Sequence, residues 1–203
     1  MLEEILLGAV QGLLEWVPIS SEGIITIISN NFLNTSLINS VQLSLFLHLG
    51  TLLSVLVYYK NEFAEMIRKP LSNLTLFIII TTIFSGISGL FSYFFLENVS
   101  ENIGFYSNVL ISIFLLITAY AQLKTRKKTG FIKEPLLKHA IIIGLVQGFS
   151  ALPGISRSGI TIATMLLLNY DKNESFKLSF LLSVPAVMLA NIFLKANGFT
   201  ILP

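Results

Sequence analysis

The sequence predicts an all-α integral membrane protein, a polytopic helical bundle. Its composition, its long apolar stretches and a duplicated motif lead to that prediction. Hydrophobic residues make up 54% of the 203 residues, charged residues only 12%, and the mean hydropathy is +0.80. A water-soluble domain of this length carries far more charge. The small net charge of +2 and the absence of cysteine argue against a nucleic-acid-binding surface, disulfides and thiolate metal sites.

Four apolar stretches approach the length of about 20 residues that a helix needs to cross a bilayer. They are Val41–Tyr59, Leu74–Leu96, Gly104–Leu123 and Leu178–Leu194. The Met-Leu-Glu-Glu start lacks the basic region and cleavage site of a signal peptide, so insertion should depend on the spans themselves. We therefore expect one integral domain over residues 1–203, with several passes through the plasma membrane.

The charges of the connections predict their sides of the membrane. Residues 60–69 and 124–138 are rich in Lys and Arg, whereas the connection with Glu97 and Glu101 has no basic residue. Basic loops stay in the cytoplasm. The two basic connections are therefore expected on the cytoplasmic side and the acidic one outside. Topological anchoring is sufficient to explain the KTRKK run.

One motif occurs twice, at an offset of 136 residues. GAVQGLLEWVPISSEGI (Gly8–Ile24) aligns without a gap with GLVQGFSALPGISRSGI (Gly144–Ile160), and eight of the seventeen positions are identical. The apolar spans that follow, Leu43–Lys60 and Leu178–Lys195, align at an offset of 135. The chain is thus a duplicated unit of interrupted segment plus span.

These limits place repeat 1 at about residues 4–60, the connecting spans at 71–124 and repeat 2 at about 139–195. Each repeat begins with an apolar segment that Pro, Gly and Ser interrupt near its middle, and such breaks occur at membrane depth only where protein or water surrounds them. If each segment crosses once, the repeats are parallel; if each is a re-entrant hairpin, they are inverted. We favour two inverted repeats, each with a re-entrant helix-loop-helix hairpin, because the Pro and Ser clusters suit two half-helices that meet at a polar loop.

The first motif places carboxylates inside an apolar segment. Gln11 and Glu15 are four residues apart and share a helix face, and Pro18 then discourages further helix. A carboxylate at membrane depth costs about 2.5–3.5 kcal/mol on insertion scales, which makes it a functional-site hypothesis. The alternative is that Glu15 reaches the interface or is held by Trp16 and serine neighbours.

The second motif is a dense set of hydrogen-bond donors. Its members are Ser156, Arg157, Ser158 and Thr161. The arginine fork suits two phosphate oxygens, and a helix that starts near Ser158 adds amides at its positive end. The pattern predicts an anion site. The alternative is that Arg157 pairs with Glu15 or Glu22 and holds the repeats together.

Other polar residues in the apolar stretches are less specific. His48 lies within a span, where a histidine is about as often a helix–helix hydrogen bonder as a base. His139 is expected at the interface. Close helix packing explains the small residues of the span at 74–96, to which we assign no chemistry; these are Ser85, Gly86, Ser88, Gly89 and Ser92.

QGLLEWVPISSEG and LPGISRSGIT resemble the glutamate-rich and PGxSRSGxT motifs of the undecaprenyl-diphosphate phosphatase family of the bacitracin-resistance type. The second motif is highly specific, and the similarity covers nearly the whole chain. The resemblance implies a membrane hydrolase that removes the terminal phosphate of a polyprenyl diphosphate. This reaction regenerates the monophosphate carrier used for cell-envelope sugars. It also implies inverted repeats with re-entrant hairpins.

Carried over residue by residue, the family's (E/Q)xxxE pair falls on Gln11 and Glu15, and its paired serines fall on Ser20 and Ser21. Its arginine motif falls on the four residues at 156, 157, 158 and 161. Two departures stand out: Ile24 occupies the position where many members have histidine, and Glu22 replaces a small polar residue. A mechanism that uses that histidine cannot operate here.

The chain also ends one span after the second motif, at Pro203, whereas family members usually continue. This suggests a short natural enzyme, a truncated chain, or a chain that closes its site as a homodimer.

These residues lead to a mechanistic hypothesis. The second motif, with Ser20, holds the diphosphate while Ser21 attacks the terminal phosphorus or positions water. Glu15, with Gln11 or Glu22, binds a divalent cation such as Mg²⁺ (or Ca²⁺) or acts as base, and His48 is a second candidate base. An apolar groove takes the prenyl chain. The rival hypothesis is a lipid-carrier flippase or secondary transporter, since such proteins also use repeats with broken helices.

Overall fold

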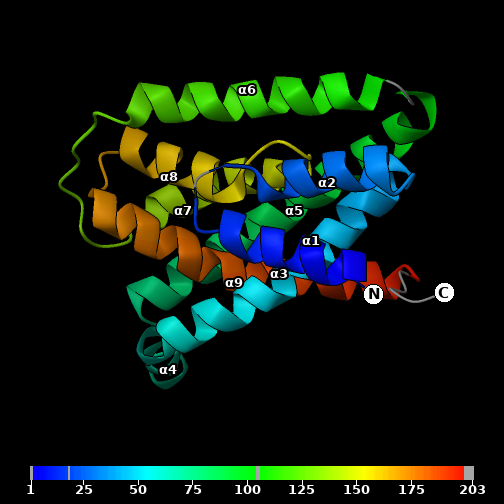
Figure 1. Cartoon of the computed structure of the whole chain (residues 1–203). Helices are drawn as coiled ribbons and strands as arrows, with labels where there is room; N and C mark the ends of the chain where they lie inside the picture. Colours follow the sequence, from blue (N-terminus) through cyan, green and yellow to red (C-terminus); the bar gives the residue numbers. More distant parts are fainter. Residues whose placement is uncertain (1, 18, 104–105, 199–203) are drawn as a thin grey trace.

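The computed structural model describes residues 2–17, 19–103 and 106–198, and this part of the chain folds as a bundle of helices without a β-strand (Figure 1). Pro18 and Gly104, expected to break the first segment and to begin the third span, lie outside the described residues. The helices are α1 (Leu2–Leu14), α2 (Ser21–Phe32), α3 (Leu37–Tyr58), α4 (Lys60–Arg68), α5 (Asn73–Ile103), α6 (Ser107–Thr125), α7 (Leu137–Gly148), the 3₁₀ turn η2 (Phe149–Ala151), α8 (Arg157–Leu167) and α9 (Lys172–Ala196).

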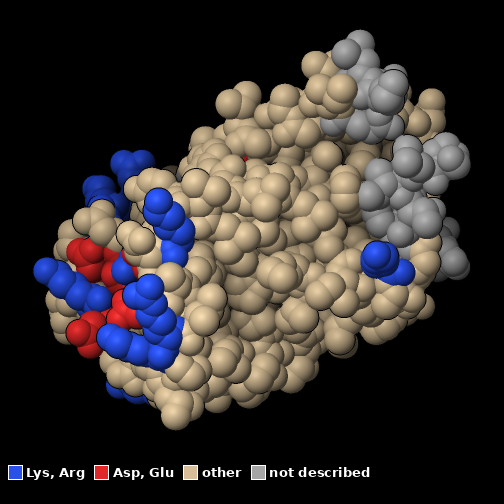
Figure 2. Space-filling view, turned by 90° about the horizontal axis from the view of Figure 1, so that it is seen from below, with Lys and Arg blue, Asp and Glu red and all other residues tan. Residues whose placement is uncertain are grey.

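Four helices, α3, α5, α6 and α9, are long and apolar enough to cross a bilayer. They coincide with the four predicted stretches, so the predicted number and positions of the long spans are confirmed. The basic connection at 60–69 is a helix, α4, rather than a loop. Most of the Lys, Arg, Asp and Glu residues seen in Figure 2 gather at one end of the molecule, and the middle of the face it shows has almost no charged side chain.

Each of the two interrupted segments forms a helical hairpin of two short helices. The first hairpin consists of α1 and α2, and the second consists of α7, η2 and α8. In the second, the amides of Phe131 and Ile132 donate to the carbonyl of Asn169 at 3.0 Å each, and the amide of Leu136 donates to the Tyr170 hydroxyl at 3.0 Å. These bonds hold the start of α7 beside the end of α8, so this hairpin returns to the end from which it entered.

In Figure 1 the first hairpin opens toward the opposite end, and the tips of both hairpins overlap near the middle of the bundle. The tips are in direct contact, because a Cβ on Gly23 would lie 3.0 Å from Cα of Gly154. Two half-helices joined by a polar loop are therefore present in each repeat. The inverted relation between the repeats stays a prediction.

Helix α6 fixes the second hairpin tip. The Thr118 hydroxyl donates to the Gly154 carbonyl at 3.1 Å and accepts from the Ser156 amide at 3.1 Å. Gly154 has φ +104°, and a Cβ there would lie 2.6 Å from the Ile111 carbonyl oxygen. Only glycine fits this turn, which places Arg157 at the start of α8.

Helix α7 lies against α5 with almost no side chain between them. A Cβ on Gly144 would meet the Thr81 carbonyl oxygen at 2.5 Å, and one on Gly148 would meet the Ser88 hydroxyl at 2.0 Å. Small residues let helix backbones approach this closely. This contact brings Gln147 of α7 beside Ser85 of α5.

Candidate active site

The first hairpin supplies a connected polar group at its tip. Glu15 Oε2 accepts a 2.8 Å hydrogen bond from the Ser21 hydroxyl and a 3.1 Å hydrogen bond from Nε2 of Gln11. The same amide nitrogen of Gln11 lies 3.2 Å from Ser21 Oγ and donates to it. All three side chains are buried. The helical spacing of Gln11 and Glu15 therefore aims both at the first turn of α2.

His48 of α3 joins this group from the side. Its Nε2 lies 3.1 Å from Glu15 Oε2, and its Nδ1 lies 2.7 Å from the carbonyl oxygen of Ser44. A carbonyl oxygen and a carboxylate both accept hydrogen bonds, an arrangement that a ring protonated on both nitrogens satisfies. His48 thus lies in the site as a hydrogen-bond donor to Glu15.

Arg157 reaches the same carboxylate from the second hairpin. Its Nη2 forms an ion pair with Glu15 Oε1. Its Nη1 is buried and has no hydrogen-bond partner among the described residues. The two halves of the chain therefore converge on one point, as expected, and half of the guanidinium fork is left for a ligand.

The paired positions Ser20 and Ser156 cap the helices that start at the two tips. Ser20 Oγ accepts from the Gly23 amide and Ser156 Oγ from the Gly159 amide, each at 3.1 Å. The N-termini of α2 and α8 therefore both lie at the site, where their free amides and dipoles favour an anion. A small cavity between them is also lined by Ser158.

Glu22, in the first turn of α2, is 7% exposed, and its Oε1 has no hydrogen-bond partner among the described residues. Both oxygens of Glu15 are already engaged, so the free oxygen of Glu22 is the place where a hard cation fits. In the described part of the chain, no three His, Asp or Glu side chains gather as a metal-binding set. A Mg²⁺ ion held here would therefore take its other ligands from substrate phosphate and water.

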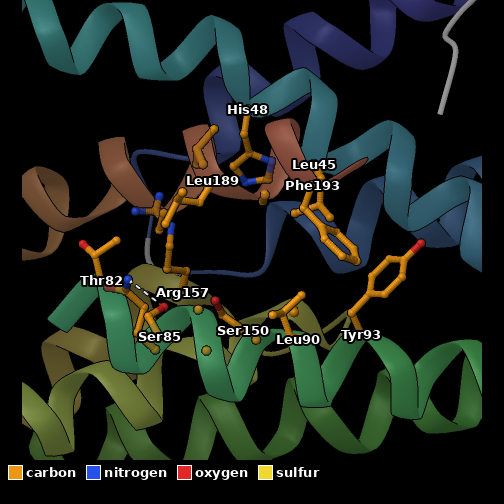
Figure 3. Close-up of a pocket in the computed structure, with 18 of the residues that line it drawn as sticks. Leu45, His48, Thr82, Ser85, Leu90, Tyr93, Ser150, Arg157, Leu189 and Phe193 are labelled. Atoms are coloured by element: carbon orange, nitrogen blue, oxygen red, sulfur yellow. Dashed lines mark hydrogen bonds between the residues drawn. The ribbon is translucent and has the colours of Figure 1, made fainter. Parts of the chain in front are cut away.

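Beside this polar group lies a cavity of about 370 Å³ that Glu22, His48 and Arg157 also line. Figure 3 shows Arg157, Thr82 and Ser85 toward one end of the cavity and Tyr93 with Phe193 toward the other. We call the first the polar end and the second, which also includes Leu45 and Leu90, the apolar end. Thr82 and Tyr93 are eleven residues apart on α5, which corresponds to about 16 Å along the axis.

Some residues lie elsewhere than expected. Thr161 is fully buried, with its hydroxyl 2.7 Å from the Arg157 carbonyl oxygen and 2.7 Å from Ser179 Oγ, so it braces α8 against α9 rather than facing the cavity. Trp16 does not hold Glu15 but packs on Phe180, with ring centroids 5.3 Å apart.

Other cavity residues were assigned no chemistry from the sequence. Ser85, Gln147 and Ser150 line the cavity, and Ser85 accepts a 3.1 Å hydrogen bond from Nε2 of Gln147. The repeat alignment contained a signal for one of them, since Gln147 aligns with Gln11. No signal separated Ser85 from the packing serines of the same span, because only the approach of α7 to α5 distinguishes it.

Comparison with known proteins agrees with this geometry. The family model described as bacitracin resistance protein BacA matches residues 4–201. An undecaprenyl-diphosphatase of Methanococcoides burtonii is 36% identical, over 97% of this chain and 78% of the relative. An undecaprenyl-diphosphatase of Methanococcus maripaludis is 40% identical over 94% of this chain and 77% of the relative, and undecaprenyl-diphosphatase 4 of Bacillus thuringiensis is 40% identical over 98% and 75%. The chain therefore belongs to the bacitracin resistance protein BacA family.

Proposed function

We propose that this protein is an undecaprenyl-diphosphatase, a membrane hydrolase that removes the terminal phosphate of a polyprenyl diphosphate. The observation that carries the proposal is the meeting of Arg157 and Glu15, from opposite halves of the chain, at the polar end of a cavity whose other end is apolar. The head group of the substrate is doubly charged or more, and its chain is a hydrocarbon. Both parts match the cavity.

The terminal phosphate binds between the two hairpin tips. The unpartnered Nη1 of Arg157 donates to the oxygens of this phosphate. Further donors are the first amides of α2 and α8 and the hydroxyls of Ser20, Ser156 and Ser158. The prenyl chain follows α5 toward Leu90, Tyr93 and Phe193. The cavity is too small to enclose a whole polyprenyl chain, so most of the chain remains in the bilayer.

Phosphoryl transfer needs a positioned nucleophile and neutralisation of charge. Ser21 is oriented for the first task, because it donates to Glu15 and accepts from Gln11. Its Oγ attacks the terminal phosphorus, its proton passes to Glu15 Oε2, and the bond to the bridging oxygen breaks to release prenyl monophosphate. Water then hydrolyses the phosphoserine and frees inorganic phosphate. His48 holds the Glu15 carboxylate in place by donating a hydrogen bond to it, and Glu15 returns the proton to Ser21 Oγ when water cleaves the phosphoserine.

A divalent cation, Mg²⁺ or Ca²⁺, would be held by Glu22, because both oxygens of Glu15 are engaged, and it would supply further neutralisation of phosphate charge. We also propose that the protein lies in the plasma membrane with residues 60–69 and 124–138 on the cytoplasmic side. A homodimer is part of the same proposal, because the long helices leave apolar faces exposed.

The direct test is phosphate release from farnesyl and longer prenyl diphosphates by purified protein in detergent, with and without a chelator. We expect release by the wild type and loss of roughly 10³-fold in rate in Arg157→Ala and Glu15→Ala. A flippase or transporter would release no phosphate, and that result would overturn the proposal.

A further inference from the structure

A second polar cluster lies in the cavity, outside the group around Glu15. Ser85 of α5, Gln147 of α7 and Ser150 of η2 line the same space as Arg157. Figure 3 shows Ser85 and Ser150 on the α5 side of the cavity and His48 on the opposite side, with Arg157 between. The cluster contains no ionisable side chain, although it lies at the polar end of the cavity, beside Arg157.

Gln147 has unused hydrogen-bonding capacity. It is 1% exposed, its Nε2 donates to Ser85 Oγ, and its Oε1 has no partner among the described residues. The Ser150 hydroxyl likewise forms no hydrogen bond within the described part of the chain. A buried polar atom without a partner costs about 1–3 kcal/mol, and the unpartnered atom here, Oε1, is an acceptor that the Ser85 hydroxyl satisfies when the amide turns over.

The comparison of the two repeats explains why Gln147 has no carboxylate partner. At the equivalent position in the first hairpin, Gln11 donates to Glu15, but Ala151 takes the place of Glu15 in the second. Gln147 therefore turns to α5. A serine hydroxyl accepts and donates equally well, so Ser85 can donate to Oε1 of the turned-over amide, and Nε2 is then free to donate to a ligand in the cavity.

We propose that Ser85, Gln147 and Ser150 form a neutral subsite for the lipid-proximal phosphate of the substrate. This inference rests on the proposed function. The terminal phosphate carries more charge and takes Arg157 and the helix N-termini, whereas the proximal phosphate ester needs only neutral donors. Ser85 and Tyr93 are eight residues apart on α5, about 12 Å, so a chain that leaves this subsite enters the apolar end directly.

The subsite would act on the leaving group. When the terminal phosphorus separates from the bridging oxygen, negative charge develops on the proximal phosphate, which leaves as prenyl monophosphate. The turned-over amide of Gln147 and the Ser150 hydroxyl would donate to that phosphate and stabilise the charge as it forms. The cluster should therefore affect catalysis as well as the binding of substrate and product.

The test compares Gln147→Leu and Ser85→Ala with Ser88→Ala. Ser88 is on the same helix and is also 7% exposed, but its hydroxyl donates to the Phe84 carbonyl of its own helix and lies outside the cavity lining. The measurements are kcat/KM for farnesyl diphosphate, and inhibition by farnesyl phosphate and by inorganic phosphate. Thermal stabilisation by farnesyl phosphate reports binding without turnover.

Gln147→Leu and Ser85→Ala should lower kcat/KM roughly 10-fold to 100-fold and weaken the binding of farnesyl phosphate by a similar factor. Inhibition by inorganic phosphate should change less than about 2-fold, because it binds at Arg157. Ser88→Ala should match the wild type. Unchanged affinity for farnesyl phosphate, or an equal loss for inorganic phosphate, would overturn the subsite. Failure of the wild type to hydrolyse farnesyl diphosphate would instead overturn the proposed function, and the binding measurement would still decide the subsite.

Discussion

The two hairpins place the same backbone feature on either side of one site. Ser20 and Ser156 occupy equivalent positions, and each caps a helix whose N-terminus faces the ligand. Beyond the caps the hairpins differ: the first carries Glu15 and Glu22, and the second carries Arg157. The carboxylates suit proton transfer and cation binding, whereas the guanidinium suits phosphate. Each hairpin supplies charged groups that the other lacks, so the two repeats are complementary while sharing a common fold.

The largest effect should come from exchanging the charges that differ. The double variant Glu15→Arg with Arg157→Glu keeps an ion pair between the tips but reverses its direction. We expect it to fold and to remain roughly 10³-fold below the wild type in phosphate release, because the arginine no longer lies at the start of α8 and the carboxylate no longer faces Ser21. Recovery of activity would mean that the pair only joins the hairpins.

Two adjacent serines of the first hairpin have different expected roles, one in the reaction and one in capping a helix. Ser21→Ala removes the hydroxyl that donates to Glu15 and should lower kcat by roughly 10²-fold to 10³-fold. Ser20→Ala removes a helix cap, which should lower stability by about 1 kcal/mol, with a loss of activity of about 10-fold or less. Acid-quenched wild type should carry phosphoserine at position 21. A Ser21→Ala variant with near wild-type kcat would contradict the assigned nucleophile.

The cavity can be blocked between its polar and apolar ends by a substitution on α5. A Cβ on Gly86 would meet open space in the cavity, so Gly86→Leu should raise KM for farnesyl diphosphate about 10-fold. Gly50→Leu is the matched control, because Gly50 also has open space around it but lies on an exposed face of α3. Hydrolysis of p-nitrophenyl phosphate, which has no chain, should be affected much less. Equal effects of both leucines would argue against a chain path along α5.

The smallest effect concerns the tip of the second hairpin. Gly154→Ala forces a side chain into a left-handed turn and against the Ile111 carbonyl oxygen, and it should cost about 2 kcal/mol of stability. Gly12→Ala places its Cβ in open space on α1 and should be neutral or slightly stabilising. Thermal unfolding in detergent measures both. A stable Gly154→Ala variant would show that the tip tolerates another backbone conformation.

Local patterns were sufficient to predict most of the fold and the residues at the tips. Length and hydropathy gave the four long helices, since a membrane leaves few other structures for an apolar chain. The second motif predicted a helix that starts near Ser158, and α8 begins at Arg157, where Ser156 caps it by a local interaction. The free-energy cost of a charge at membrane depth predicted that Glu15 and Arg157 belong to a functional site.

Only the tertiary structure decided which of these groups meet. Glu15 and Arg157 are 142 residues apart, and their contact depends on two hairpin tips that touch at Gly23 and Gly154. The close approach of α7 to α5 likewise separated Ser85, which faces the cavity, from Ser88, which does not. Sequence periodicity fixes the face of a helix on which a residue lies, but the packing of helices remote in the chain determines what that face contacts.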